Sequence, residues 1–64
     1  MNNNDARAND RLLKMKDIQE LLQLSRSGVY TAMRLRGFPQ PVKIGGSSRW
    51  WRSEVFSWMN ELSA

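Results

Sequence analysis

The fold is decided by the stretch from Ser25 to Arg36, which reads Ser-Arg-Ser-Gly-Val-Tyr-Thr-Ala-Met-Arg-Leu-Arg. Ser25 is a favourable N-cap, because its hydroxyl can accept a hydrogen bond from an unpaired backbone N–H of a first helical turn. Gly37 follows the stretch at the position where a helix ends in left-handed backbone, which is inexpensive only without a Cβ. Pro39 then prevents the helix from continuing. We therefore predict a helix between Ser25 and Gly37.

The predicted helix has two chemically different sides. A rotation of about 100° per residue puts three apolar residues together: Val29, Ala32 and Met33. The other side carries hydroxyl and guanidinium groups and no acid: Ser27, Thr31 and Arg34, with Arg26 and Tyr30 at its rim. Such groups contact phosphates and base edges of nucleic acids. An ordinary amphipathic helix with a solvated basic face has the same pattern, and this helix alone does not separate the two interpretations.

The residues before this helix predict a partner for it. Ile18, Leu21 and Leu22 form an apolar stripe at helical spacing within residues 15–22. Gln23-Leu24 leaves only a short turn between the two helices, as a helix-turn-helix requires. Leu12 and Leu13 suggest a short edge strand within residues 11–14. Residues 1–9 are polar and Asn-rich, so we predict a disordered tail there and a folded domain over residues 10–64.

The residues after Gly37 predict a β-hairpin. Two prolines keep residues 38–41 extended and lead into residues 42–44, where apolar and basic residues alternate. Residues 45–48 (Gly-Gly-Ser-Ser) are a turn signal, and residues 49–51 return. Lys43 and Arg49 are thereby expected near a Gly-rich tip, as in a DNA-touching wing. A hairpin that only closes the core is the alternative.

A last helix is predicted over residues 52–62. Its apolar stripe follows i, i+3, i+4, i+7 spacing: Val55, Trp58, Met59 and Leu62. Ser53 is the expected N-cap, and Glu54 suits the first turn. Phe56 lies about 100° off the stripe, so it is either a half-exposed filler or a contact with another copy.

Composition restricts the class of function. The 64 residues include no Cys and no His, which removes disulfides, the usual zinc ligands and the usual general base, so neither catalysis nor a metal or other cofactor is expected. No apolar run approaches a membrane span of about 20 residues, and we expect a cytoplasmic, nucleoid-associated protein. Between Leu21 and Ser53 there are six basic residues and no acid, within a net charge of +4. Such a one-signed block favours a polyanionic partner, the alternative being a soluble basic surface.

Three segments together resemble a known family. They are Leu-Ser-Arg-Ser at residues 24–27, Gly-Phe-Pro at 37–39, and Trp-x-x-Ser-Glu-Val-x-x-Trp at 50–58. With the leucines of residues 12–22 and Pro-Val-Lys-Ile-Gly at 41–45, they resemble the AlpA family of phage-type regulators over residues 11–62. That family is related to small excisionases and to the winged-helix domain of MerR-like proteins.

The resemblance implies a second helix in the DNA major groove and a hairpin wing against the backbone or minor groove. By position it places Ser25, Arg26, Ser27, Tyr30 and Arg34 on the recognition helix, Gly45, Gly46 and Arg49 on the wing, and Trp50 and Trp58 in the core. This sequence departs from the family's pattern at three positions: Gln23 stands for a usual Gly, Gly28 for a Thr, and Trp51 for a basic residue. If residue 23 needs left-handed backbone, Gln in place of Gly lowers the stability by roughly 1 kcal/mol or less.

The sequence therefore predicts a mainly α domain with a small β-hairpin, a winged helix-turn-helix. We expect sequence-specific binding of double-stranded DNA, by a prophage or integrative-element transcription regulator or a recombination directionality factor (excisionase). Possible partners are further copies on adjacent sites and an integrase. The alternative is a small protein-interaction module with an exposed aromatic patch of Trp51 and Phe56. The sequence supports RNA binding less well, because it shows no aromatic cluster on a sheet surface where unpaired bases could stack. The expected DNA-binding residues are Arg26, Ser27, Tyr30, Thr31, Arg34, Arg36, Lys43, Gly46, Ser47, Ser48 and Arg49.

Overall fold

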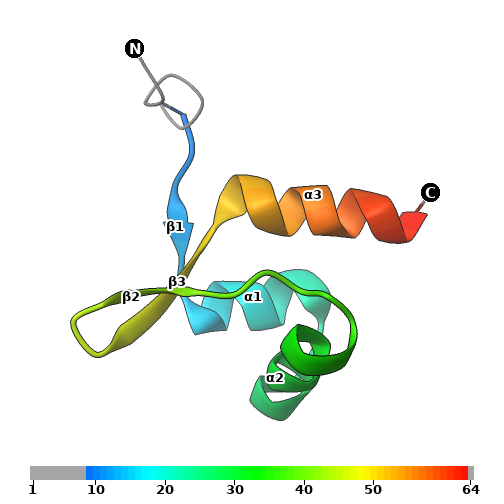
Figure 1. The fold of residues 1–64 in the computed structure, drawn as a ribbon, viewed down its shortest axis with the longest axis horizontal. Coiled ribbons are helices and arrows are strands. Elements are labelled where there is room, and N and C mark those ends of the chain that lie inside the picture. The colour runs from blue at the N-terminus through cyan, green and yellow to red at the C-terminus, as the bar shows by residue number, and fades with distance from the viewer. Residues whose placement is uncertain (1–8, 64) are drawn as a thin grey trace.

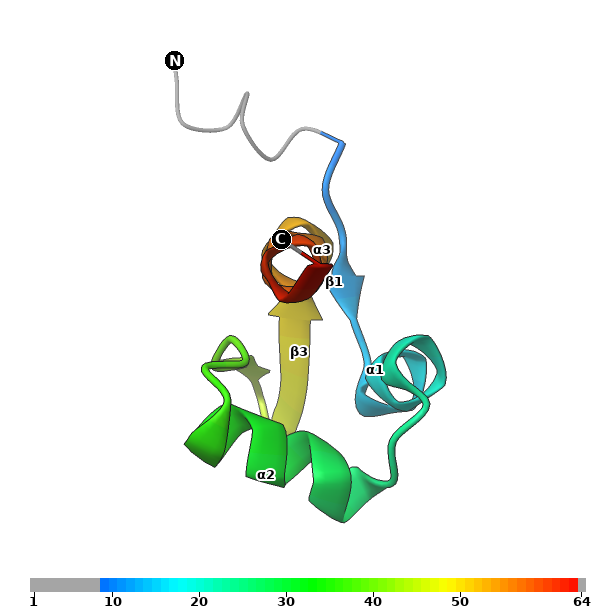
Figure 2. The same cartoon turned by 90° about the vertical axis from the view of Figure 1, so that its right-hand side faces the viewer.

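The computed structural model describes residues 9–63 and contains three helices and three short strands. In chain order they are β1 (Leu12–Leu13), α1 (Met15–Leu22), α2 (Arg26–Leu35), β2 (Val42–Ile44), β3 (Ser47–Trp51) and α3 (Arg52–Ser63). Figures 1 and 2 show α3 above, α2 below and α1 at an intermediate height. In Figure 1 the hairpin of β2 and β3 extends to one side. The predicted tail over residues 1–9 lies outside the described residues, apart from Asn9.

Local signals account for the helix-turn-helix. As predicted, the Ser25 hydroxyl caps α2 by accepting a hydrogen bond of 3.1 Å from the Gly28 N–H. Gln23 turns the chain between the helices in left-handed backbone (φ 58°, ψ 44°), and its side-chain amide donates to the Glu20 carbonyl at 2.9 Å. Residue 23 thus does adopt left-handed geometry, at a cost of roughly 1 kcal/mol or less for a residue with a Cβ.

The chain reversal at the end of α2 places Phe38 in the core. The Ala32 carbonyl accepts from the N–H groups of both Arg36 and Phe38, at 2.9 and 3.2 Å. Gly37 lies between those donors with a φ of 74°, so the left-handed position predicted there is confirmed. The reversal turns Phe38 inward, where only 2% of its surface is exposed.

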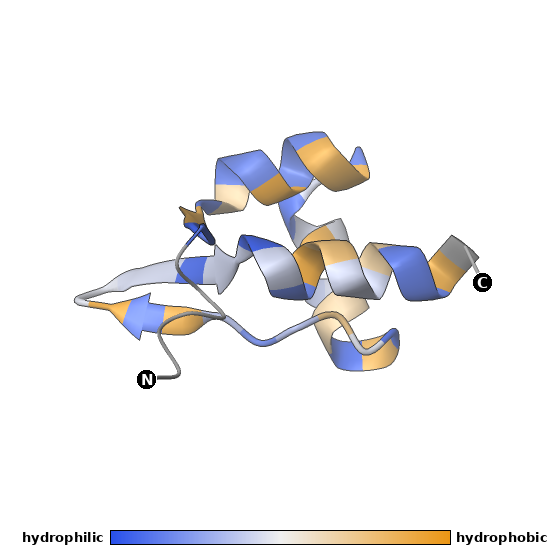
Figure 3. Ribbon diagram, turned by 90° about the horizontal axis from the view of Figure 1, so that it is seen from above, coloured by the Kyte–Doolittle hydropathy of each residue, from blue (hydrophilic) through white to orange (hydrophobic). Residues whose placement is uncertain are grey.

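The sheet is antiparallel with strand order β1-β3-β2, so the predicted short edge strand exists and β3 is central. Leu13 pairs with Trp50, while Lys43 pairs with Ser48 and Val42 with Arg49. The turn is only Gly45-Gly46, and Gly45 has a φ of 62°. The strand β2 alternates hydrophobic and hydrophilic residues, as its colours show (Figure 3).

Two expectations about the hairpin were wrong. Ser47 and Ser48 belong to β3 and not to the turn, because a two-residue connection is enough once Ile44 pairs with Ser47. Arg49 lies opposite Val42, at the end of the β2–β3 ladder away from the turn, and only Lys43 is near the tip.

The start of α3 is held by a residue from the other end of the chain. Ser53 was expected as the N-cap but lies inside α3, which begins at Arg52. The Asp10 carboxylate accepts instead from the Ser53 N–H at 3.0 Å and from its hydroxyl at 2.6 Å. The Arg52 N–H donates to the Arg11 carbonyl at 2.9 Å, so the two residues before β1 supply the acceptors that the start of a helix needs.

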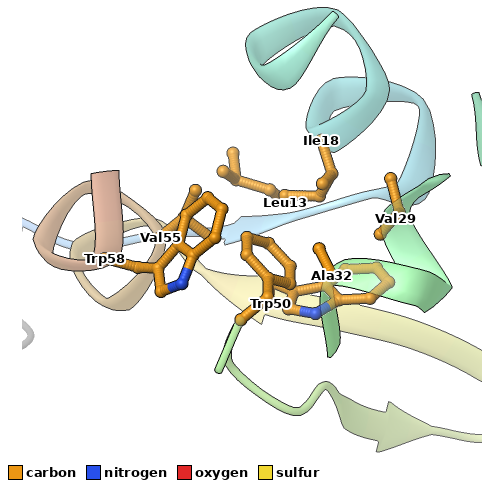
Figure 4. Close-up of a cluster of buried hydrophobic side chains, with 8 residues drawn as sticks. Leu13, Ile18, Val29, Ala32, Trp50, Val55 and Trp58 are labelled. Carbon is orange, nitrogen blue, oxygen red and sulfur yellow. The ribbon is translucent and has the colours of Figure 1, made fainter. Parts of the chain in front are cut away.

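One hydrophobic core joins all the elements except β2. Figure 4 shows its side chains converging from the three helices, β1 and β3. The Phe38 and Trp58 rings meet edge to face, 5.0 Å apart between centroids. The Trp50 indole N–H donates to the Pro39 carbonyl at 3.0 Å and that of Trp58 to the Arg36 carbonyl at 2.9 Å, so both large rings are buried with their polar atom satisfied. The buried residues are Leu13, Ile18, Val29, Ala32, Phe38, Trp50, Val55 and Trp58.

Two residues of the predicted apolar stripes are not covered. Leu21 is 38% exposed and Leu62 is 63% exposed, while the other stripe residues of α1 and α3 are buried or packed against the core. Periodicity identifies the apolar side of a helix, but coverage depends on where neighbouring elements end. The arrangement as a whole confirms the predicted winged helix-turn-helix. Within residues 9–63, no helix is long and apolar enough to cross a membrane.

Candidate nucleic-acid interface

The outer side of α2 is as the sequence predicted. Its inner side is anchored in the core by Val29 and Ala32, which are 0% and 2% exposed. The outward side, here called the recognition face, consists of Ser27, Tyr30, Thr31 and Arg34. All of these are exposed except Thr31, which is half-buried. Arg26 continues this face, with its guanidinium carbon 6.0 Å from the centre of the Tyr30 ring.

One serine of the hairpin orients two basic side chains. The Ser48 hydroxyl accepts a hydrogen bond of 2.7 Å from the Lys43 ammonium. The Ser48 carbonyl accepts from the Arg49 guanidinium at 3.0 Å. Both cations are therefore bound to the same residue of β3. Lys43 is its partner on β2, and Arg49 is the next residue in the chain.

A hollow of about 400 Å³ separates α2 from the hairpin, and we call it the basic hollow. Among the residues that the structure describes, its walls carry five basic side chains and no acidic one. It brings together seven of the predicted DNA-binding residues: Arg26, Tyr30, Lys43, Gly46, Ser47, Ser48 and Arg49. Clefts lined by one sign of charge concentrate the field and attract ions of the opposite sign.

Four predicted residues lie outside the basic hollow. Ser27, Thr31 and Arg34 belong to the recognition face, beyond its edge. Arg36 follows the last turn of α2, and its side chain is exposed while its carbonyl accepts from the Trp58 indole. The predicted residues therefore form two adjoining parts, a helical face and a basic hollow, with Arg26 and Tyr30 in contact with both.

Two lysines of the basic hollow were missed by the sequence reasoning. Lys14 and Lys16 come from the start of α1 and line the hollow beside Met15. Their charge was hidden because Asp17 and Glu20 follow within six residues, so the local net charge is zero. In the structure these two acids line a different hollow from the two lysines.

That second hollow, here called the amphipathic groove, has a volume of about 340 Å³ and lies between β1, α1 and α3. Its apolar lining is Leu13, Leu21 and Phe56, and its charged lining is Arg11 and Arg52 with Asp17 and Glu20. The Arg52 guanidinium covers the Phe56 ring at 4.3 Å, and Phe56 is 36% exposed. Arg52, the last of the six basic residues between Leu21 and Ser53, therefore shares this groove with two acids and does not line the basic hollow.

Comparisons with known proteins agree with this architecture. The family model described as prophage CP4-57 regulatory protein (AlpA) matches residues 11–62. A protein of Enterobacteria phage P4, named uncharacterized protein ORF88, is 39% identical over 51 residues, which cover 78% of this chain and 58% of that relative. The chain thus spans less than two thirds of the length of that relative. No solved structure gives a significant match. Because the family model covers nearly all of the described residues, the chain belongs to the AlpA family of phage-associated DNA-binding regulators.

Proposed function

We propose that the protein binds double-stranded DNA sequence-specifically, with the recognition face of α2 in the major groove and the hairpin against the backbone. The observation that carries this proposal is the surface formed by the recognition face and the basic hollow, to which the described residues contribute no acid. Hydroxyl and guanidinium groups on an exposed helix read base edges, whereas basic groups beside them hold phosphates. No chemical step is part of this proposal, and the nucleoid is the place of action.

Arg34 is the residue with which to test base reading, because it lies on the recognition face and its side chain is exposed. The operator is first located by footprinting on DNA that flanks the gene. Arg34→Ala should then weaken operator binding by about 1–3 kcal/mol, with a smaller loss on unrelated DNA and an unchanged melting temperature. Equal losses on both DNAs would make Arg34 a phosphate contact. Arg52→Ala, in the amphipathic groove, is the matched control and should leave operator binding unchanged.

The role that we propose for this binding is regulation of prophage or integrative-element genes, or help to an integrase as a directionality factor. A single module of this kind buries only about 600–1,000 Å² on DNA. Several copies side by side would increase this area, and Phe56 and Trp51 are the aromatic residues that we propose for contacts between copies. Phe56 is 36% exposed and Trp51 is half-buried.

DNA bending separates the two roles. A directionality factor must shape DNA for an integrase, and bending costs about 1–6 kcal/mol that extra contacts must offset. We expect cooperative binding to closely spaced repeats, with a bend that grows as copies are added, measured by circular-permutation gel shifts on a multi-site fragment. Phe56→Ser should reduce the cooperativity and leave single-site affinity unchanged. Independent occupancy without bending would leave promoter regulation as the role.

The amphipathic groove supports a second candidate, a protein-interaction module. Its apolar floor includes the exposed side chains of Leu21 and Phe56, and its walls carry opposite charges. In that case the basic residues only keep the domain soluble. Binding to DNA would be weak, and substitution of these basic residues would hardly change it. The salt dependence of DNA binding distinguishes the two candidates.

A further inference from the structure

The basic hollow has three walls, and one of them comes from neither α2 nor the hairpin. Arg26 and Tyr30 come from α2, Lys43 and residues 46–49 supply the hairpin wall, and the third wall is Lys14 and Lys16 at the start of α1. We propose that this hollow is a phosphate-binding site that grips the DNA backbone between α2 and the hairpin, with Lys14 and Lys16 as its third wall. The inference rests on the proposed DNA binding, which it extends to α1.

The lining fits a phosphate in charge. Five cations surround a hollow into which, within the described part of the chain, no carboxylate projects. The nearest acid in the chain, Asp17, is directed elsewhere: its carboxylate accepts from the Lys14 backbone N–H at 2.9 Å and lines the amphipathic groove. Lys14 and Lys16 therefore keep their charge available to the hollow, and both side chains are exposed.

The lining also fits a phosphate in geometry. Gly46 contributes backbone without a side chain, and a Cβ built there would meet nothing within 4 Å, so an incoming backbone has room at this edge. Ser47 and Tyr30 add hydroxyl groups beside the cations, and hydroxyls and backbone N–H groups are common phosphate contacts. Ser48 already orients Lys43 and Arg49, which reduces the ordering that binding requires.

A charge-matched pair of double variants tests the site. Lys14→Gln with Lys16→Gln removes two charges from the basic hollow, and Arg11→Gln with Arg52→Gln removes two charges from the amphipathic groove. Loss of two phosphate contacts should make the slope of log K against log salt shallower by about 2, so that the affinity lost between 50 and 200 mM salt becomes about 12-fold smaller. The lysine variant should show this equally on operator and unrelated DNA, because phosphate contacts do not read sequence. The arginine variant should keep the wild-type slope.

The outcomes separate this inference from the proposed function. If the wild-type protein binds DNA and the lysine variant keeps its slope, or if both variants change it equally, the third wall does not exist. A protein that binds no DNA refutes the proposed function instead. Titration of the DNA-free protein with pyrophosphate, followed by NMR, tests the hollow independently. We expect shifts confined to the amides of Lys14, Lys16, Arg26 and residues 46–49 that disappear in the lysine variant, and shifts spread over the surface, or none, would overturn the site.

Discussion

Trp50→Ala is expected to remove much or all of the protein's stability against unfolding. Trp50 is fully buried on the central strand β3, where it pairs with Leu13 of β1. The centre of its ring lies 6.3 Å from that of Phe38. Truncation of a buried Trp costs about 3–5 kcal/mol, and the Pro39 carbonyl would also lose its donor. A domain of this size has a total stability of about 3–10 kcal/mol, so the change removes much or all of it. Thermal unfolding followed by circular dichroism measures the loss.

The adjacent tryptophan is the matched control. Trp51 carries the same side chain on the next residue of β3, but it points to the opposite face of the sheet and is half-exposed. We expect Trp51→Ala to cost about 1 kcal/mol and to retain a cooperative transition. Similar losses for the two variants would show that the core is not centred on Trp50.

Binding to DNA is expected to weaken steeply with salt. Five basic side chains line the basic hollow, and Arg34 and Arg36 lie on or beyond α2. If these groups neutralise about four to six phosphates, log K falls with log salt with a slope of about −4 to −5. Affinity should then drop by about 250- to 1,000-fold between 50 and 200 mM salt, which fluorescence anisotropy on a labelled duplex can follow.

The same measurement decides between the two candidate functions. A protein-interaction module that uses the amphipathic groove would release few counterions from DNA. A slope of log K against log salt shallower than about −2 would therefore mean that the basic surface is not the binding surface. A steep slope on unrelated DNA, together with a tighter complex on the operator, is the signature of backbone gripping combined with base reading.

The helices could be predicted because their signals are local. The Ser25 cap, the left-handed Gly37 and the Ile18 stripe each depend on residues within about one helical turn. The bounds of α1 therefore agree with the prediction, and α2 ends one residue before Arg36. The departure at Gln23 was equally informative, since this residue has the left-handed backbone that was considered for the site.

The hairpin and the start of α3 could not be predicted in the same detail. Four consecutive turn-forming residues follow Ile44, and any of them could connect the strands. The two-residue turn is selected by pairing, because Trp50 must face the core while β3 bonds to β1 and β2 together. The carboxylate that holds α3 comes from Asp10, 43 residues away from Ser53, and no local pattern indicates it.

The order of the elements, the place of Trp58 on the buried stripe of α3 and the outward side of α2 follow from the sequence, since periodicity and caps depend on near neighbours in the chain. The burial of Phe38 was not predicted. Only the tertiary structure decided which charges act together. It brought Lys14 and Lys16 to the basic hollow, and it placed Arg52 with Asp17 and Glu20 in the amphipathic groove. The physical reason is that electrostatic interaction depends on distance in space, and the elements packed around α1 decide which of the neighbouring charges share a hollow.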